Sequence, residues 1–242
     1  MLRWMLRARC GKLSTVLLAA VLCSAGWGLL LRARVAAADV KGQLVLGTLK
    51  PQPQPKPPRS AYNWELENGV KEVLPLRVSA PRELAVVLVG DGQPKGEARV
   101  EVAVSGGALL PSTLVLRTDS TLRIRNDDEI GHELFAEGLD GFSAEATSPG
   151  ATRSVHLVKA GSWPLRDKLA PHADAYLHVL PDLVASAQLE ANGSFVFNDV
   201  PAGKYTLKVF QGATEIAAKA VEVGDKPLTL EPMIASNDKA AR

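Results

Sequence analysis

The residues best suited to chemistry in this chain are its four histidines, all of which lie between positions 132 and 178. Both cysteines lie within the first 38 residues, so no thiolate is available in the rest of the chain. Imidazole and carboxylate ligands without sulfur suit Cu(II) and Zn(II). His172, Asp174 and His178 would share one face if their segment were extended throughout, because side chains alternate along a strand. No HxxxH or HxH pair supports this site, so we favour structural roles for the histidines.

Patterns that signal catalysis are absent from the sequence. No serine stands in a G-x-S-x-G context, and there is no glycine-rich phosphate-binding loop. The acidic run Asp127-Asp128-Glu129 lacks the spacing of a calcium loop, so we expect it to be a solvated turn. The sequence therefore predicts a protein that is not an enzyme.

Residues 1–38 have the pattern of an export signal. Four basic residues precede a charge-free run from Leu13 to Leu31, and an A-x-A cleavage site ends at Ala38. The apolar run exceeds the roughly 7–15 residues of a typical signal, so an uncleaved inner-membrane anchor at 13–31 is the alternative. Either route predicts a periplasmic or secreted protein.

Charge and cysteine content limit the possible partners and the source of stability. Removing residues 1–38 takes away six basic and no acidic residues, which changes the net charge from +2 to −4. A mildly acidic chain is not expected to bind nucleic acid, which requires a clustered basic face. Without cysteines, the exported part must be stabilised by apolar burial, and its length suffices for one or two cores.

Short apolar segments predict a nearly all-β protein. The continuous run from Leu84 to Val89 indicates a strand buried on both faces, and Asn192-Gly193 indicates a hairpin turn. The proline-rich stretch 51–58 predicts an extended polyproline II connector. Further strands are predicted at 42–47, 100–104, 113–116, 121–125, 153–158, 175–180, 194–197 and 205–210.

Three stretches of the middle of the chain resemble the plastocyanin-like domain of exported cupredoxin and methylamine-utilisation-type proteins. They are Asn126-Asp127-Asp128-Glu129-Ile130-Gly131-His132, Trp163 to Asp167 and Pro171 to Tyr176. In that family an N-x-D-x-x-x-H segment supplies the first histidine ligand of copper, and a later C-x-x-H-P-x-M segment supplies the other three ligands.

The resemblance implies a cupredoxin fold that has lost its type 1 copper site. His132 matches the first ligand, whereas Asp167, Ala170 and Ala173 stand at the cysteine, histidine and methionine positions. His132, His172 and Asp167 remain candidates for a copper or zinc site. The interpretation that we favour has no cofactor: His132 is a hydrogen-bonded loop residue, and the other three histidines are surface strand positions.

A second resemblance surrounds the first. Residues 190–207, with the Asn-Gly turn, resemble the transthyretin-like carboxypeptidase regulatory module, and Lys41 to Gly47 resembles its opening strand. We therefore expect a cupredoxin-like β-sandwich at 97–180 inserted in a transthyretin-like β-sandwich formed by 39–96 and 181–230. A simple tandem is the alternative, and residues 231–242 are expected to be a flexible tail.

These features together predict an exported, non-catalytic module of the cell envelope. Its sandwich surfaces would bind a protein or a glycan. The alternative is a periplasmic metal-binding protein that handles copper or zinc through His132 and its neighbouring His and Asp residues.

Overall fold

The computed structural model describes residues 37–47, 49–50, 78–91 and 99–236. The expected export segment, except for Ala37 and Ala38, and the proline-rich stretch 51–58 lie outside the described residues. Within the described ranges, no helix is long and apolar enough to span a membrane.

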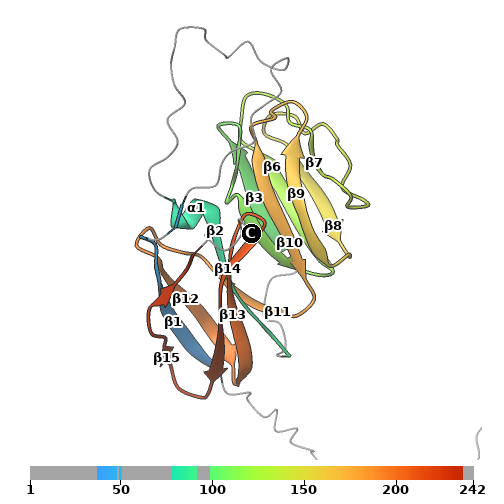
Figure 1. The fold of residues 1–242 in the computed structure, drawn as a ribbon. Helices are drawn as coiled ribbons and strands as arrows, with labels where there is room; N and C mark the ends of the chain where they lie inside the picture. Colours follow the sequence, from blue (N-terminus) through green and yellow to red (C-terminus); the bar gives the residue numbers. More distant parts are fainter. Residues whose placement is uncertain (1–36, 48, 51–77, 92–98, 237–242) are drawn as a thin grey trace, which may run out of the picture. The chain divides into compact units, whose positions relative to one another are not determined.

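The all-β prediction is confirmed. The described strands form four sheets of four strands each. Figure 1 shows how the labelled strands are arranged. The described residues contain one helix, α1 (Ala80–Glu83), which is a single turn ahead of a strand.

Two of the sheets combine strands from the beginning and the end of the chain. One has the order β12-β1-β15, with β16 also paired to β1, and the other has the order β11-β2-β13-β14. Val40 of β1 lies opposite Phe197 of β12, and Leu88 of β2 lies opposite Leu207 of β13, both in antiparallel pairs. The strands are β1 (Ala37–Val45), β2 (Leu84–Gly90), β11 (Leu183–Ala187), β12 (Ser194–Pro201), β13 (Gly203–Gln211), β14 (Thr214–Val223), β15 (Leu228–Thr229) and β16 (Met233–Ile234).

The other two sheets are formed by residues 99–180 alone. Their orders are β4-β3-β6-β8 and β5-β10-β9-β7, and the pairs β3–β6 and β5–β10 are parallel. The strands are β3 (Arg99–Ser105), β4 (Ala108–Leu110), β5 (Thr113–Arg117), β6 (Ser120–Asn126), β7 (Leu134–Ala136), β8 (Thr152–Leu157), β9 (Gly161–Asp167) and β10 (Asp174–Leu180).

Strand β2 is buried on both faces, as its continuous apolar sequence predicts. Val86, Val87 and Leu88 have no exposed surface. Because side chains alternate along a strand, Val86 and Leu88 join the core between the sheets of β1 and β2. Val87 and Val89 point the other way and form a separate cluster with Leu183 and Phe210.

Three apolar clusters stabilise the described part of the chain. The first contains Phe195 and Phe197, whose rings pack edge to face at 5.6 Å. The second fills the sandwich of residues 99–180 and includes Trp163, which is 8% exposed. The third is the small cluster of Val87, Val89, Leu183 and Phe210, against which Val115 and Leu180 pack. It therefore joins strands from the two pairs of sheets.

The Asn192-Gly193 turn is confirmed. Gly193 has a φ of +86°, a conformation that residues with a side chain rarely adopt. The Asn192 Oδ1 accepts a 2.9 Å hydrogen bond from the Ser194 N–H, and the Glu190 N–H donates to the Ser194 carbonyl at 2.9 Å.

The expected flexible tail is wrong for residues 231–236. Met233 lies opposite Leu44 in a parallel pair between β16 and β1, and Ala235 is fully buried. The reason is that Leu230 and Met233 pack against the first apolar cluster, which the polar composition of the tail does not reveal. Residues 237–242 lie outside the described residues.

Candidate functional site

His132 lies buried at the end of the 99–180 sandwich where three connections meet. It lies between β6 and β7, and its backbone forms an isolated bridge with Thr147 through hydrogen bonds of 3.1 and 2.7 Å. Its side chain has no exposed surface. A buried imidazole needs hydrogen-bond partners for its two nitrogens, so the neighbours of this ring decide its chemistry.

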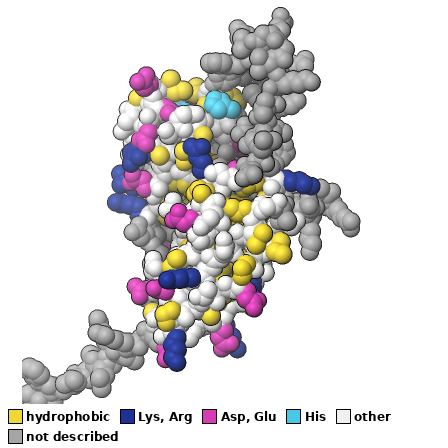
Figure 2. Space-filling model, turned by 90° about the vertical axis from the view of Figure 1, so that its left-hand side faces the viewer, with side chains coloured by type: hydrophobic (Ala, Val, Ile, Leu, Met, Phe, Trp, Pro, Cys, Tyr) yellow, Lys and Arg dark blue, Asp and Glu magenta, His cyan; other side chains and the backbone are white. Residues whose placement is uncertain are grey.

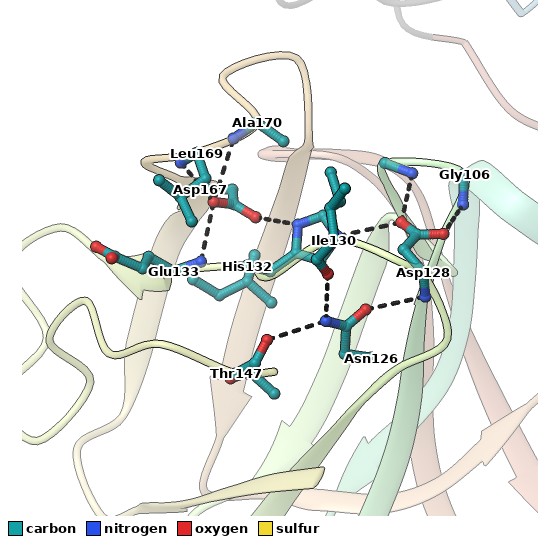
Figure 3. Close-up of polar contacts among 12 residues, drawn as sticks. Gly106, Asn126, Asp128, Ile130, His132, Glu133, Thr147, Asp167, Leu169 and Ala170 are labelled. Atoms are coloured by element: carbon teal, nitrogen blue, oxygen red, sulfur yellow. Dashed lines mark hydrogen bonds and ion pairs between the residues drawn. The ribbon is translucent and has the colours of Figure 1, made fainter. Parts of the chain in front are cut away.

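One partner is Asp167, the last residue of β9. The Asp167 Oδ2 lies 2.5 Å from the His132 Nδ1. A dashed line marks this contact in Figure 3. The Asp167 Oδ1 accepts hydrogen bonds from the backbone N–H groups of Glu133 at 3.0 Å and Leu169 at 2.8 Å. This buried carboxylate therefore joins the start of β7 to the connection after β9.

The other partner is Asp128. Its Oδ2 accepts from the His132 Nε2 at 3.1 Å and from the Gly107 N–H at 2.8 Å, while its Oδ1 accepts from the Gly106 N–H at 2.6 Å. The hydrogen bond from Gly107, followed by those from Gly106 and His132, lowers the pKa of the Asp128 carboxyl against the opposing effect of burial. Asp128 therefore stays ionised beside His132 at neutral pH.

Glycine at positions 106 and 107 is what lets the backbone reach Asp128. Both residues have positive φ, +62° and +70°, so their N–H groups can converge on one carboxylate. A side chain at position 107 would also meet the His172 Nε2 at 2.5 Å. The sequence therefore fixes this turn through two glycines that no pattern around His132 identifies.

Asn126 holds the loop that carries Asp128 and His132. It is fully buried, and its Nδ2 donates to the carbonyls of Ile130 at 2.8 Å and Thr147 at 2.9 Å. Its Oδ1 accepts from the Asp128 N–H at 2.9 Å. These hydrogen bonds fix the loop, so that both carboxylates face the ring of His132 in Figure 3.

We call this set of residues, Asp128, His132 and Asp167 with Asn126, the His132 network. Both ring nitrogens face carboxylate oxygens, which can only accept, so the arrangement fits a doubly protonated imidazolium ring. The two carboxylates also accept hydrogen bonds from backbone N–H groups, those of Gly106 and Gly107 for Asp128 and those of Glu133 and Leu169 for Asp167. The network can therefore tie three loops together by charge-assisted hydrogen bonds.

The donor atoms at this place do not fit a type 1 copper site. The positions that the resemblance assigns to cysteine, histidine and methionine hold Asp167, Ala170 and Ala173, and both alanines are 1% exposed. His132 has no nitrogen free to accept a metal, because both point at carboxylates. Among the residues that the structure describes, no group of three or more His, Cys, Asp or Glu is placed to hold a metal ion.

The structure brings together two of the three candidate ligands. His132 and Asp167 are in contact, whereas His172 is exposed in the connection before β10 and lies against Gly107. His172 therefore does not continue the face of β10 that carries Asp174 and His178. Asp128 was expected in a solvated turn with Asp127 and Glu129; those two neighbours are exposed, but Asp128 is partly buried and hydrogen-bonded.

A second histidine network was not predicted. His178 on β10 is 2% exposed, which makes the expectation of a surface position wrong, whereas His156 is exposed as expected. The His178 Nε2 donates to the Gly212 carbonyl at 2.7 Å, so in the neutral ring its Nδ1 accepts from the Ser162 Oγ at 2.7 Å. The Phe210 ring lies 4.4 Å away, and burial lowers the pKa of His178. We call these residues, Ser162, His178, Phe210 and Gly212, the His178 network.

No family model matches this sequence, and comparison with curated proteins finds no match. Among solved structures, amicyanin from Paracoccus versutus matches at 14% identity and a TM-score of 0.31, over 39% of this chain and 96% of amicyanin. A purple cupredoxin from Nitrosopumilus maritimus matches at 15% identity and a TM-score of 0.30, over 33% of this chain and 98% of its own.

The copper-containing nitrite reductase from Thermus scotoductus SA-01 matches at 17% identity and a TM-score of 0.31, over 34% of this chain and 22% of its own. These are distant structural matches to cupredoxins over part of the chain. Similarity at this level says nothing about metal content or activity. The resemblance to the transthyretin-like module stays a prediction.

Proposed function

We propose that this protein is an exported, non-catalytic binding module of the cell envelope that contains a degenerate cupredoxin-like part. The observation that carries this proposal is the His132 network. At the position where the family resemblance expects copper, the imidazole of His132 is held between the carboxylates of Asp128 and Asp167. A charge pair of this kind stabilises loops but supplies no redox centre.

The domain arrangement belongs to the same proposal. Residues 97–180 form the degenerate cupredoxin-like sandwich, and 39–96 with 181–230 form a transthyretin-like sandwich around it. The pairing of β1 with β12 and of β2 with β13 supports the insertion, because these pairs join chain segments on either side of residues 97–180. In this proposal the surfaces of the two sandwiches are the functional part.

The surface is consistent with selective contact rather than with binding of a polyanion. In Figure 2, basic and acidic side chains are interspersed on one face of the molecule, and hydrophobic side chains gather between them. Mixed charges around apolar surface suit a protein or glycan partner. Export through residues 1–38 places that partner in the periplasm or outside the cell.

The binding function is tested by affinity capture from envelope extracts with the immobilised full chain. We expect a protein or a glycan to be retained under mild conditions and to be absent when the bait has been heat-denatured. Recovery of neither a protein nor a glycan would contradict the binding function.

A metal-binding function is the competing proposal, motivated by the contact between His132 and Asp167. Titration with Cu(II) and Zn(II), followed by calorimetry, separates the two, with His132→Ala as the control. We expect weak or no binding, and no strong blue absorption. If the wild type binds tightly and His132→Ala does not, metal binding replaces the proposed function. Asp128→Asn serves as a second, less disruptive variant.

A further inference from the structure

A cleft of about 440 Å³ lies where the two pairs of sheets meet. Its walls come from three strands, β3, β5 and β11. The apolar part of the lining is formed by Val100, Val115, Leu116, Leu183 and Ala185. Leu116 is a buried member of the second apolar cluster and Leu183 of the third, and Val115 is partly buried against the third cluster. These contacts fix the floor of the cleft.

Two arginines flank this apolar floor. Arg99 begins β3 and Arg117 ends β5, and both line the cleft. Neither guanidinium has an ion pair or hydrogen bond with another residue in the described part of the chain. Arg123 and Arg125, by contrast, both pair with Glu101, at 3.3 and 3.1 Å. The cleft therefore offers two uncompensated positive charges, which favour an anionic ligand.

The cleft also offers groups that accept hydrogen bonds. Glu101 and Ser186 belong to the lining, so a carboxylate and a hydroxyl lie beside the apolar floor. Strands β5 and β11 are both edge strands of their sheets: in the described residues β5 pairs only with β10, and β11 pairs only with β2. Edge strands present backbone N–H and C=O groups that an added peptide can pair with.

From this combination we infer that the cleft binds the C-terminal end of a partner protein, with a free α-carboxylate and an apolar last side chain. The carboxylate pairs with Arg99 and Arg117, the apolar side chain packs on Val115, and peptide N–H groups donate to an edge strand. This inference rests on the proposed binding function, for which it names the chemistry of the partner.

Other anions satisfy only part of the cleft. A fatty acid has a carboxylate and an apolar chain but no peptide N–H and C=O groups to pair with the edge strands β5 and β11. An acidic sugar has donors but no apolar group for Val115, Leu116 and Leu183. A peptide C-terminus supplies the charge, the apolar group and the donors together.

The test titrates the purified, isotopically labelled full chain with three probes and follows backbone NMR shifts. The probes are acetyl-Ala-Ala-Val-Leu with a free carboxylate, the same peptide as its C-terminal amide, and octanoate. We expect the free acid to bind about tenfold or more tightly than the amide, because a charge-assisted hydrogen bond is lost in the amide. Octanoate should bind more weakly than the free acid.

Variants locate the binding in the cleft. The double variant Arg99→Gln with Arg117→Gln should weaken binding of the free acid by about tenfold or more, and Lys226→Gln, an exposed lysine outside the lining, should leave it unchanged. Ser186→Trp, an exposed lining position, should block binding by filling the cleft. The inference is overturned if no probe binds, if amide or octanoate binds as tightly as the free acid, or if the double variant binds like the wild type.

Affinity capture with the double variant separates this inference from the proposed function. A partner retained by both the wild type and the double variant would overturn the cleft as the binding site and leave the binding function intact. A partner retained by the wild type alone supports both. Failure of the wild type to retain any partner counts against the binding function itself.

Discussion

The His132 network and the His178 network each bury a histidine, but they differ in the charge of the groups that bond its ring nitrogens. Each contains a histidine that is nearly or fully buried, at 0% and 2% exposure, with both ring nitrogens hydrogen-bonded. The partners of His132 are two carboxylates. The partners of His178 are a hydroxyl and a backbone carbonyl, both uncharged.

The difference shows that the partners, rather than the burial, decide which form of a buried imidazole a fold accommodates. At His132 both ring nitrogens face carboxylate oxygens, which can only accept hydrogen bonds. Neutral partners and the Phe210 ring leave desolvation as the main effect at His178, so its pKa is lowered and the neutral ring is favoured. The His132 network is thus an ion pair that holds loops together. The His178 network is a neutral contact between the two pairs of sheets.

The largest effect is expected from breaking the ion pair at Asp167. Asp167→Asn keeps the shape and one oxygen that accepts from the backbone N–H groups of Glu133 and Leu169, but it removes the charge that faces the His132 Nδ1. We expect a loss of about 3 kcal/mol in the free energy of unfolding, because a buried charge loses its partner. Urea denaturation at pH 7 measures it.

The control for this change is Asp127→Asn, one residue from Asp128. Asp127 is exposed and pairs with the exposed Arg125 at 2.6 Å, so we expect no measurable change in stability. If the two asparagine variants are equally stable, His132 is not held by an ion pair, and the contrast with His178 fails.

A smaller loss is expected from His178→Phe. Phenylalanine keeps an aromatic ring against Phe210 but removes the hydrogen bonds to Gly212 and Ser162. The expected cost at pH 7 is about 2 kcal/mol, because the Gly212 carbonyl loses its donor. His156→Phe on β8 is the matched control, since His156 is exposed, and should change stability little. Equal effects of both variants would contradict a role for His178 in joining the sheets.

The sequence predicted the strands and part of the His132 network. Alternating and continuous apolar runs are local signals, so β2, β6, β10 and the Asn192-Gly193 turn lie where expected. His132 and Asp167 were brought together as candidate metal ligands by the family resemblance. The structure places them in contact, but as hydrogen-bonded partners whose ring nitrogens and carboxylate oxygens are already engaged.

The roles of Asp128 and His178 could not be predicted, because they depend on contacts between residues that are distant in sequence. The sequence predicts Asp128 to be part of a solvated acidic turn. Its partners Gly106 and Gly107 lie more than twenty residues earlier, so no local pattern shows that they bind it. The sequence predicts His178 to lie on the solvent-exposed face of a strand. Nothing in residues 175–180 shows that the turn at Gly212 covers this side chain. Periodicity identifies which side chains share a face, but it does not show what packs against that face.

The contribution of His178 to the free energy of unfolding should depend on pH near neutrality. Because its pKa is lowered in the folded chain, the unfolded chain binds its proton first, and stability falls as pH decreases below about 6.5. The free energy of unfolding then changes by at most about 1.4 kcal/mol per pH unit through this one group. His178→Phe lacks it, so the stability difference between wild type and variant should narrow from pH 7 to pH 5. A constant difference in urea denaturation across that range would contradict a neutral, buried His178.

The smallest effect is expected at Asp128, and it should appear in a more acidic range. Asp128→Asn removes the charge beside the His132 Nε2 but keeps one acceptor oxygen for Gly106 or Gly107. Because the Asp128 side chain is 15% exposed and partly screened, we expect a cost of about 1 kcal/mol or less at pH 7.

The pKa of Asp128 is lowered from its ordinary 3.8, so its contribution is present above that value and is lost as pH falls through the lowered folded-state pKa. The difference between wild type and Asp128→Asn should therefore be constant from pH 7 to pH 5, where the His178 difference narrows, and should shrink only below about pH 4. Urea denaturation of both variants across this range, with the exposed Glu129→Gln as control, tests whether the two networks titrate separately. Narrowing of the Asp128 difference already between pH 7 and pH 5 would show that Asp128 is not held ionised by Gly107, Gly106 and His132.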